Sequence, residues 1–125
     1  MDTIKEQEIK TVIEHLIKAG TTYDIVQLEL VYHDDLEVFM FAENRKIQTF
    51  SKKDFKQLFI TKRANNEPPL NNWALFNDIQ VKEDKAHVLI TRKVKLLDTN
   101  QKIRLSIDLI FEDNRWQVIR EVIFS

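Results

Sequence analysis

The chain has 125 residues, of which 43% are hydrophobic, a formal net charge of -1 and no cysteine. This length predicts one domain over residues 1–125, large enough to bury a core without disulfide or metal cross-links. The balanced charge lacks the excess of basic residues that binding to nucleic acid or an anionic membrane requires. The missing cysteines exclude disulfides and thiolate metal sites. A single glycine, Gly20, excludes glycine-rich phosphate loops. A charged start and the lack of any long apolar run predict a cytoplasmic protein.

Two helices are expected first. Apolar residues recur at intervals of three and four, which predicts an amphipathic helix from about Ile4 to Ala19 that ends at Gly20. Thr21-Thr22 then offers an N-cap for a shorter helix through about Tyr32, with Asp24 in its first turn.

A strand pair follows. The run His33-Asp34-Asp35 is expected to end the second helix. Leu36–Ala42 is apolar and aromatic enough for a strand, Glu43-Asn44-Arg45-Lys46 resembles a turn, and Ile47–Phe50 is the expected partner strand.

The clearest local signature marks a third helix. Ser51 is the expected N-cap, Asp54 follows three residues later, and Phe50 can reach Phe55 as a hydrophobic staple. This helix is expected to fade near Arg63.

The rest of the chain is predicted to form a four-strand meander. Its strands are Asn72–Val81, Lys85–Leu97, Lys102–Glu112 and Arg115–Phe124, joined by turns that include Asp98-Thr99-Asn100-Gln101. Helices segregated from a mostly antiparallel sheet predict an α+β fold with the helices on one sheet face.

Two arginines interrupt the apolar face of the last three strands. Side chains alternate there with a period of two, and Arg92 and Arg120 fall among the alternate residues that form the apolar face. If both point into a pocket, they can hold a carboxylate or phosphate while aliphatic neighbours hold an apolar body. The alternatives are a structural ion pair with Asp35, Glu37 or Glu121, or a β-bulge that turns one arginine to solvent.

A second candidate site lies where the second helix meets the first strand. His33 stands beside Asp34 and Asp35, and Tyr32 precedes it. An imidazole oriented by a carboxylate is a candidate general base, although such a run is also typical of a solvated helix end. The three histidines are scattered, so no metal or other cofactor is expected.

Aromatic residues and the opposite sheet face complete the candidates. Trp73 and Trp116 pack in the core or line a cavity, together with Tyr23 and Tyr32. The alternate residues on the opposite, outer face of the last strands include both aliphatic and polar side chains. Such a mixture suits a protein interface better than a surface exposed to solvent. We therefore expect a homodimer through this outer face.

The chain resembles the nuclear transport factor 2-like superfamily, which includes ketosteroid isomerase and the SnoaL-like proteins. The resemblance rests on the element order, on Lys18-Ala19-Gly20 before a short helix ending in Tyr32-His33-Asp34-Asp35, and on the closing Asp113-Asn114-Arg115-Trp116-Gln117-Val118. It implies a cone-shaped α+β fold, a curved and mostly antiparallel sheet with three helices from the N-terminal half packed on its concave face.

The catalytic residues of these relatives do not carry over. The isomerase tyrosine falls near Ile13 and its general-base aspartate near Met40, and neither residue can move a proton. The epoxide hydrolases have an arginine followed two residues later by an aspartate. In this chain Arg92 is followed at that position by Val94, so this pattern is not matched either.

The leading hypothesis is a dimeric small-molecule-binding domain. Its cone accepts an apolar ligand with an acidic group, anchored by Arg92 and Arg120 and lined by Tyr32, Trp73 and Trp116. The rival is an isomerase, dehydratase or cyclase that uses His33 with Asp34 or Asp35. A third hypothesis is an interaction module that assembles with a different protein.

Overall fold

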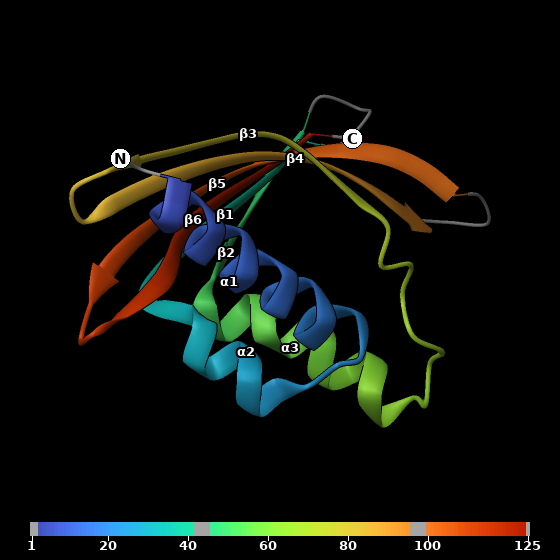
Figure 1. Cartoon of the computed structure of the whole chain (residues 1–125). Helices are drawn as coiled ribbons and strands as arrows, with labels where there is room; N and C mark the ends of the chain where they lie inside the picture. The colour runs from blue at the N-terminus through green and yellow to red at the C-terminus, as the bar shows by residue number, and fades with distance from the viewer. Residues whose placement is uncertain (1–2, 42–45, 96–99, 125) are drawn as a thin grey trace.

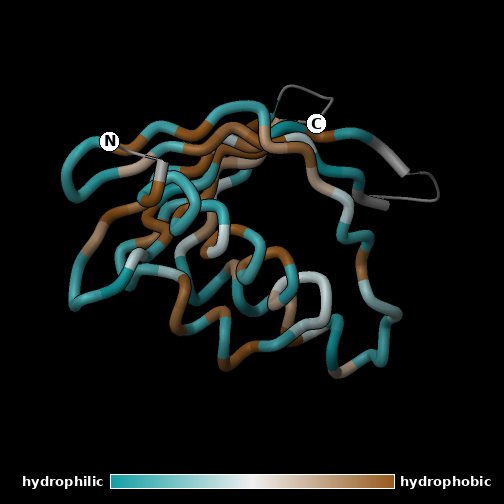
Figure 2. Tube along the Cα trace, in the orientation of Figure 1, coloured by the Kyte–Doolittle hydropathy of each residue, from teal (hydrophilic) through white to brown (hydrophobic). Residues whose placement is uncertain are grey.

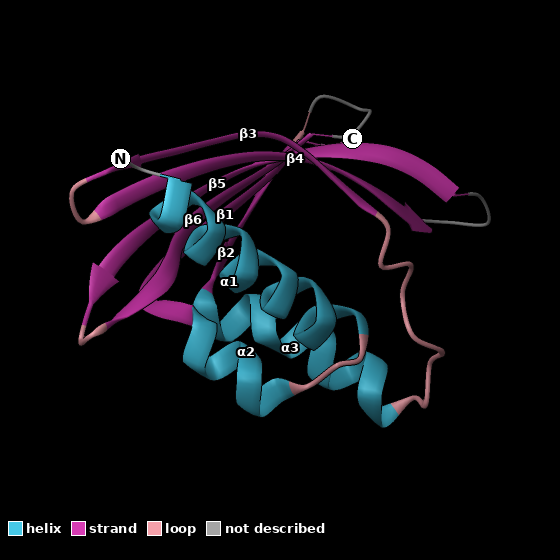
Figure 3. Cartoon of the chain, viewed as in Figure 1, coloured by secondary structure: helices cyan, strands magenta, loops and turns pink. Residues whose placement is uncertain are grey.

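The computed structural model describes residues 3–41, 46–95 and 100–124 (Figure 1). Within this part the chain forms three helices and six strands (Figure 3). In chain order they are α1 Thr3–Thr21, α2 Ile25–Val31, β1 Tyr32–Phe41, β2 Ile47–Ser51, α3 Lys52–Ala64, β3 Ala74–Lys82, β4 Lys85–Lys95, β5 Asn100–Glu112 and β6 Arg115–Phe124.

The strands form one sheet in the order β2-β1-β6-β5-β4-β3. β1 runs parallel to β6, and the other neighbouring pairs are antiparallel. The sheet is curved, and all three helices lie on one side of it (Figure 1). We call this helix-covered side the concave face and the other side the convex face. The predicted α+β fold with helices on the concave face is therefore confirmed.

The first helix does not end at Gly20 as predicted. It continues to Thr21, and the left-handed residue that ends this region is Tyr23, with a φ of 56°. The hydroxyl groups of Thr21 and Thr22 donate to carbonyl oxygens of the preceding turn, at 2.8 Å to Ile17 and 2.6 Å to Lys18. These bonds satisfy the helix end, so the glycine is not required there.

The start of β1 also differs from the prediction. Asp24 is itself the N-cap of α2, and its side chain accepts a hydrogen bond from the backbone N–H of Gln27. The helix then ends at Val31, and His33-Asp34-Asp35 belongs to β1 rather than to a helix end. Tyr32 is both the C-cap of α2 and the first residue of the strand, so the change from helix to strand takes no intervening loop.

The third helix begins as predicted. The Ser51 side chain accepts from the backbone N–H of Asp54 at 3.2 Å, which makes Ser51 the N-cap of α3. The rings of Phe50 and Phe55 lie 5.8 Å apart, consistent with the expected staple. This capped start fixes α3 against the first strand pair.

A β-bulge in β6 changes which side chains face the helices. Leu109 of β5 pairs with Val118, but Asp108 pairs with Arg120, so Ile119 is an extra residue on β6. An extra residue reverses the alternation of every side chain beyond it. Glu121 therefore joins the concave face, and Arg120 moves to the convex face.

The core lies between the concave face and the helices. Hydrophobic and hydrophilic stretches alternate along the strands, as expected for a sheet covered on one side (Figure 2). The largest fully buried side chains come from both layers: Ile9, Ile13, Leu28, Val38, Val88, Ile90, Ile107, Leu109 and Val118. None of the helices in the described ranges combines the length and apolar character needed to cross a bilayer.

Some predictions fall outside the described residues. They are Ala42 at the end of the first predicted strand, Glu43-Asn44-Arg45 of the predicted turn, Leu96-Leu97 at the end of the second meander strand, and Asp98-Thr99 of its turn.

Candidate functional site

Arg92 lies on the concave face, as the alternation predicts. Its neighbours in register are Ala74 on β3 and Ile103 on β5. Its Nε donates to the carbonyl oxygen of Trp73 at 3.0 Å, and its Nη2 donates to that of Asn71 at 2.8 Å. These two bonds fix the guanidinium group against the segment that enters β3. The N–H groups of Nη1 take no part in them.

Glu121 is the second charged group of the concave face. Only 3% of Glu121 is exposed, as is 3% of Tyr32 on β1. Burial raises the pKa of Glu121 to about 7, against the opposing effects of the Arg92 charge and the Tyr32 hydroxyl. Burial, followed by the negative charge of Glu121, raises the pKa of Tyr32 well above its usual value.

The charge of Arg92 is linked to this pair through space. Burial lowers the pKa of Arg92, while Glu121 and Tyr32 act in the opposite direction. Among the ion pairs of the described residues, none joins Arg92 to Glu121 within 4.0 Å. Tyr32 on β1, Arg92 on β4 and Glu121 on β6 thus act on one another's pKa without a direct ion pair between Arg92 and Glu121. We call these three residues the interior cluster.

Arg120 does not belong to this cluster, contrary to the prediction. It is exposed, and its guanidinium carbon lies 4.9 Å from the centre of the Phe39 ring. The bulge at Ile119 is the physical reason, because it reverses the alternation before Arg120. The alternation indicated the right strand, β6, but the wrong residue, Arg120 instead of the adjacent Glu121. Glu121 was considered only as an ion-pair partner for an arginine.

The aromatic candidates lie in three different places. Trp73 is 37% exposed, and the Lys93 ammonium group lies 4.7 Å from the centre of its ring. Trp116 is half-buried against the core and contacts Phe111 edge to face at 5.4 Å. Tyr23 is buried and donates to the carbonyl oxygen of Pro68 at 2.8 Å. Of the aromatic candidates, only Tyr32 joins the interior cluster.

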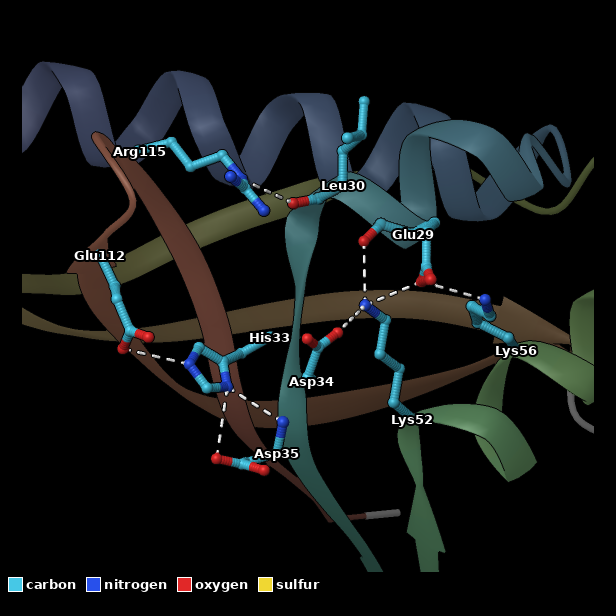
Figure 4. Close-up of polar contacts among 9 residues, drawn as sticks. All are labelled: Glu29, Leu30, His33, Asp34, Asp35, Lys52, Lys56, Glu112 and Arg115. Atoms are coloured by element: carbon cyan, nitrogen blue, oxygen red, sulfur yellow. Dashed lines mark hydrogen bonds and ion pairs between the residues drawn. The ribbon is translucent and has the colours of Figure 1, made fainter.

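His33 is held by hydrogen bonds on both ring nitrogens (Figure 4). Its Nδ1 accepts from the backbone N–H of Asp35 at 3.0 Å, which places the ring proton on Nε2. Nε2 then donates to the Glu112 carboxylate at 3.2 Å, beside the turn between β5 and β6. The imidazole is 10% exposed. Both nitrogens are occupied, so His33 joins β1 to this turn and presents no free base.

Asp34 belongs to a separate group of ion pairs at the surface (Figure 4). The Lys52 ammonium group lies 3.0 Å from the Asp34 carboxylate and 2.7 Å from that of Glu29, and it also donates to the backbone carbonyl of Glu29. Lys56 adds a second contact to Glu29 at 3.0 Å. The same contacts lower the pKa of both carboxyl groups, chiefly through the hydrogen bond from Lys52. They tie α2, β1 and α3 together.

A pocket of about 450 Å³ lies between the end of α1 and the start of β3. It lies beside the segment that holds Arg92, because Ala74 in its wall is the register neighbour of Arg92 and Asn72 lies between the two residues whose carbonyl groups hold the guanidinium. Tyr32, Arg92 and Glu121 themselves do not line it. Its lining combines apolar and polar side chains: Glu14, Ile17, Lys18, Thr21, Thr22, Asn72, Ala74 and Phe76. Within the described ranges, no group of His, Asp and Glu side chains is arranged to hold a metal ion.

Comparison with known proteins identifies the fold. No protein-family model and no curated protein matches the sequence. An NTF2-like protein of unknown function from Silicibacter pomeroyi DSS-3 matches with a TM-score of 0.78 and 13% identity, over 98% of this chain and 97% of that one. NTF2-like proteins from Pseudomonas putida KT2440 and Cytophaga hutchinsonii ATCC 33406 each reach 0.76, at 18% and 19% identity. Those matches cover 100% and 94% of this chain, and 89% and 94% of the relatives.

This chain therefore has the NTF2-like fold, which confirms the resemblance found in its sequence. The fold occurs with many unrelated functions, so a likeness at this level of identity says nothing about activity. A functional conclusion has to come from the interior cluster and the pocket between α1 and β3.

Proposed function

We propose that this protein binds a small apolar molecule with an acidic group, between α1 and the start of β3, and that Arg92 anchors the acid. One observation carries the proposal. Arg92 stands on an apolar face with its guanidinium group already oriented by two backbone carbonyls, next to a pocket of about 450 Å³. A fixed guanidinium whose Nη1 takes no part in the two bonds that hold it is suited to a carboxylate or phosphate. Ile17 and Phe76 offer apolar contacts for the rest of the ligand.

Native mass spectrometry of freshly purified protein tests this proposal. The expected result is a retained small molecule in the wild type that is lost in Arg92→Met. Arg63→Met is the matched control, because it removes an equal charge from an exposed position in the last turn of α3. Retention by both variants would refute the role of Arg92, provided that circular dichroism shows both to be folded.

We further propose that two copies of the chain associate through their convex faces. This face carries exposed apolar residues on three strands, Leu75, Leu89 and Phe124. It also carries both signs of charge, with Arg120 and Asp108 opposite each other in register. A twofold contact needs such a self-complementary patch.

Light scattering after size exclusion tests the dimer. A dimer is expected for the wild type, and a monomer for Phe124→Glu, which places a charge in the apolar patch. Elution of the wild type as a monomer at micromolar concentration would refute this contact. A complex of the monomer with a different protein would favour the interaction module instead.

The second candidate function is acid–base catalysis, and the buried pair Tyr32 and Glu121 favours it. A carboxyl group with a pKa near neutrality can both give and take a proton at physiological pH. In such an enzyme Glu121 takes the role that the sequence suggested for His33 with Asp34 or Asp35. Deuterium uptake by carbonyl compounds in heavy water is the test: Glu121→Gln should abolish it, and His33→Gln should retain it. Equal activity in the wild type and Glu121→Gln would refute this function.

The location in the cell stays a prediction. The lack of cysteine favours a reducing compartment such as the cytoplasm.

A further inference from the structure

Two further hollows, of about 560 and 290 Å³, adjoin each other along α1. Four residues line both of them: Thr11, Val12, Arg115 and Trp116. Their walls come from α1, the end of α2 and the hairpin that joins β5 to β6, and they share no lining residue with the pocket between α1 and β3. We call the combined hollow the α1–hairpin groove. It follows α1 from Ile4 to His15, about 16 Å at the helical rise of about 1.5 Å per residue.

Apolar side chains in the walls of this groove are open to solvent. Ile4 is 74% exposed, and Leu30 and Phe111 are exposed as well. Trp116 is half-buried, and its ring packs edge to face against that of Phe111. Exposed apolar side chains that gather in one place typically mark a contact with another molecule. Tryptophan and arginine, the residues at positions 116 and 115, are the types in which the binding energy of protein interfaces is most often concentrated.

Arg115 is the central charge of the groove because it lines both hollows. Its Nε donates to the carbonyl oxygen of Leu30 at 3.4 Å, so the guanidinium group lies toward the end of α2 (Figure 4). Within the described part of the chain, no carboxylate lies within 4.0 Å of it. Glu8 is the one carboxylate among the described wall residues, and it lines the larger hollow alone. A cation without an acidic partner, set between apolar walls, is complementary to a molecule that brings a carboxylate.

The walls also favour a helical occupant. Extended peptides commonly bind by adding a strand to the edge of a sheet. The edge strands of this sheet are β2 and β3, and neither contributes a residue to the groove. A segment bound there finds no open strand to pair with, so it has to satisfy its own backbone hydrogen bonds, as a helix does. A length of about 16 Å corresponds to about three turns of such a helix.

We propose that the α1–hairpin groove binds an amphipathic helix of a partner protein, with an acidic side chain of that helix paired to Arg115. Apolar residues spaced by about one turn on the partner helix contact Val12, Leu30 and Trp116. This interaction uses neither the pocket between α1 and β3 nor the convex face, so it is independent of the proposed function.

Two helical peptides test the proposal. The probe is an alanine-based helix with leucines along one face and a central glutamate, and its control carries lysine in place of the glutamate. Amide and indole NMR signals of the labelled protein report where each peptide binds. The glutamate peptide should shift the signals of α1 and of the Trp116 indole. It should bind about tenfold more tightly than the lysine peptide, because lysine replaces attraction to Arg115 by repulsion.

Variants of the wall separate charge from packing. Arg115→Glu should reverse the preference, so that the lysine peptide binds more tightly, and Arg115→Gln should remove it. Glu8→Gln should keep the preference for glutamate. Arg63→Met, which removes an exposed cation from the last turn of α3, should match the wild type.

Several outcomes would overturn the proposal. They are equal binding of the two peptides by the wild type, no binding of either at millimolar concentration, shifts confined to other faces, and an unchanged preference in folded Arg115→Glu. Groove signals that change with protein concentration alone would assign the groove to a second copy of the chain instead. Shifts caused by dodecanoate but by neither peptide would assign it to a fatty acid.

Discussion

Replacement of Glu121 by glutamine should stabilise the protein at neutral and alkaline pH. The wild-type carboxyl group is almost fully buried, so its ionisation carries a desolvation cost that ionisation of an exposed carboxyl group does not. Glutamine has nearly the same shape, but it carries no charge. The substitution therefore removes the cost of ionisation and leaves the packing in place.

The size and sign of this effect follow from the pKa of Glu121. Its value of about 7 in the folded protein compares with 4.5 for an exposed glutamate. The folded state thus holds a proton that the unfolded state has lost, and the free energy of unfolding falls as pH rises from about 4.5 to about 7. A difference of this size corresponds to about 3 kcal/mol once both states are ionised. Below the lower value the contribution of Glu121 is fully favourable and the two proteins should be similar.

Urea unfolding at a series of pH values measures the effect. The gain in Glu121→Gln over the wild type should grow through the mildly acidic range and level off above about pH 7. Glu37→Gln is a matched control, because it removes the same charge at an exposed position on β1. Parallel curves for the wild type and Glu121→Gln would refute the reasoning, since they would mean that Glu121 ionises equally in both states.

Three further predictions concern the helices. Ser51→Ala should lower the free energy of unfolding by about 1 kcal/mol in a denaturant titration because α3 loses its N-cap, and Ser51→Asp should restore it. Lys52→Met should cost about 1 kcal/mol because its two carboxylate partners lose their shared cation, whereas exposed Lys53→Met should have little effect on the melting temperature. Gly20→Ala should raise the free energy of unfolding by about 0.5 to 1 kcal/mol, because Gly20 lies inside α1. An added Cβ would meet the Phe59 ring at 3.6 Å, an ordinary contact distance. A decrease in the free energy of unfolding would contradict this prediction.

The sequence predicted the elements whose signals are local. The N-cap at Ser51 depends on residues three positions apart, and the alternation in Lys85–Leu97 repeats within one strand, so short windows reveal both. The boundary of β1 was less predictable. His33-Asp34-Asp35 is polar and reads as a helix end, but Tyr32 and Glu37 on either side of it pair with β6. His33 also bonds to Glu112, so the run lies within β1. Such contacts span most of the chain and leave no local mark.

The interior cluster could be predicted only in part. Arg92 keeps its expected face because β4 and β5 pair without a break through Ile103. Arg120 and Glu121 exchange faces because of one extra residue, Ile119. No glycine or proline marks that bulge, and Arg120 precedes apolar residues in the apparent apolar parity, so alternation alone favours the wrong assignment. The available signal was that Glu121 alternates with Ile119 and Ile123, each two positions away, and is the only acid among them.

The bulge also explains how one chain keeps an acid and a base apart on an apolar face. Without it, Arg120 would lie on the concave face beside Arg92, and two cations would share an interior that only Tyr32 could partner. With it, the face receives Glu121, which opposes the charge of Arg92 without closing a direct ion pair. The Nη1 group of Arg92 takes no part in the two bonds that hold its guanidinium. A local change in register thus replaces a repulsive pair of cations on this face by a cation and an acid.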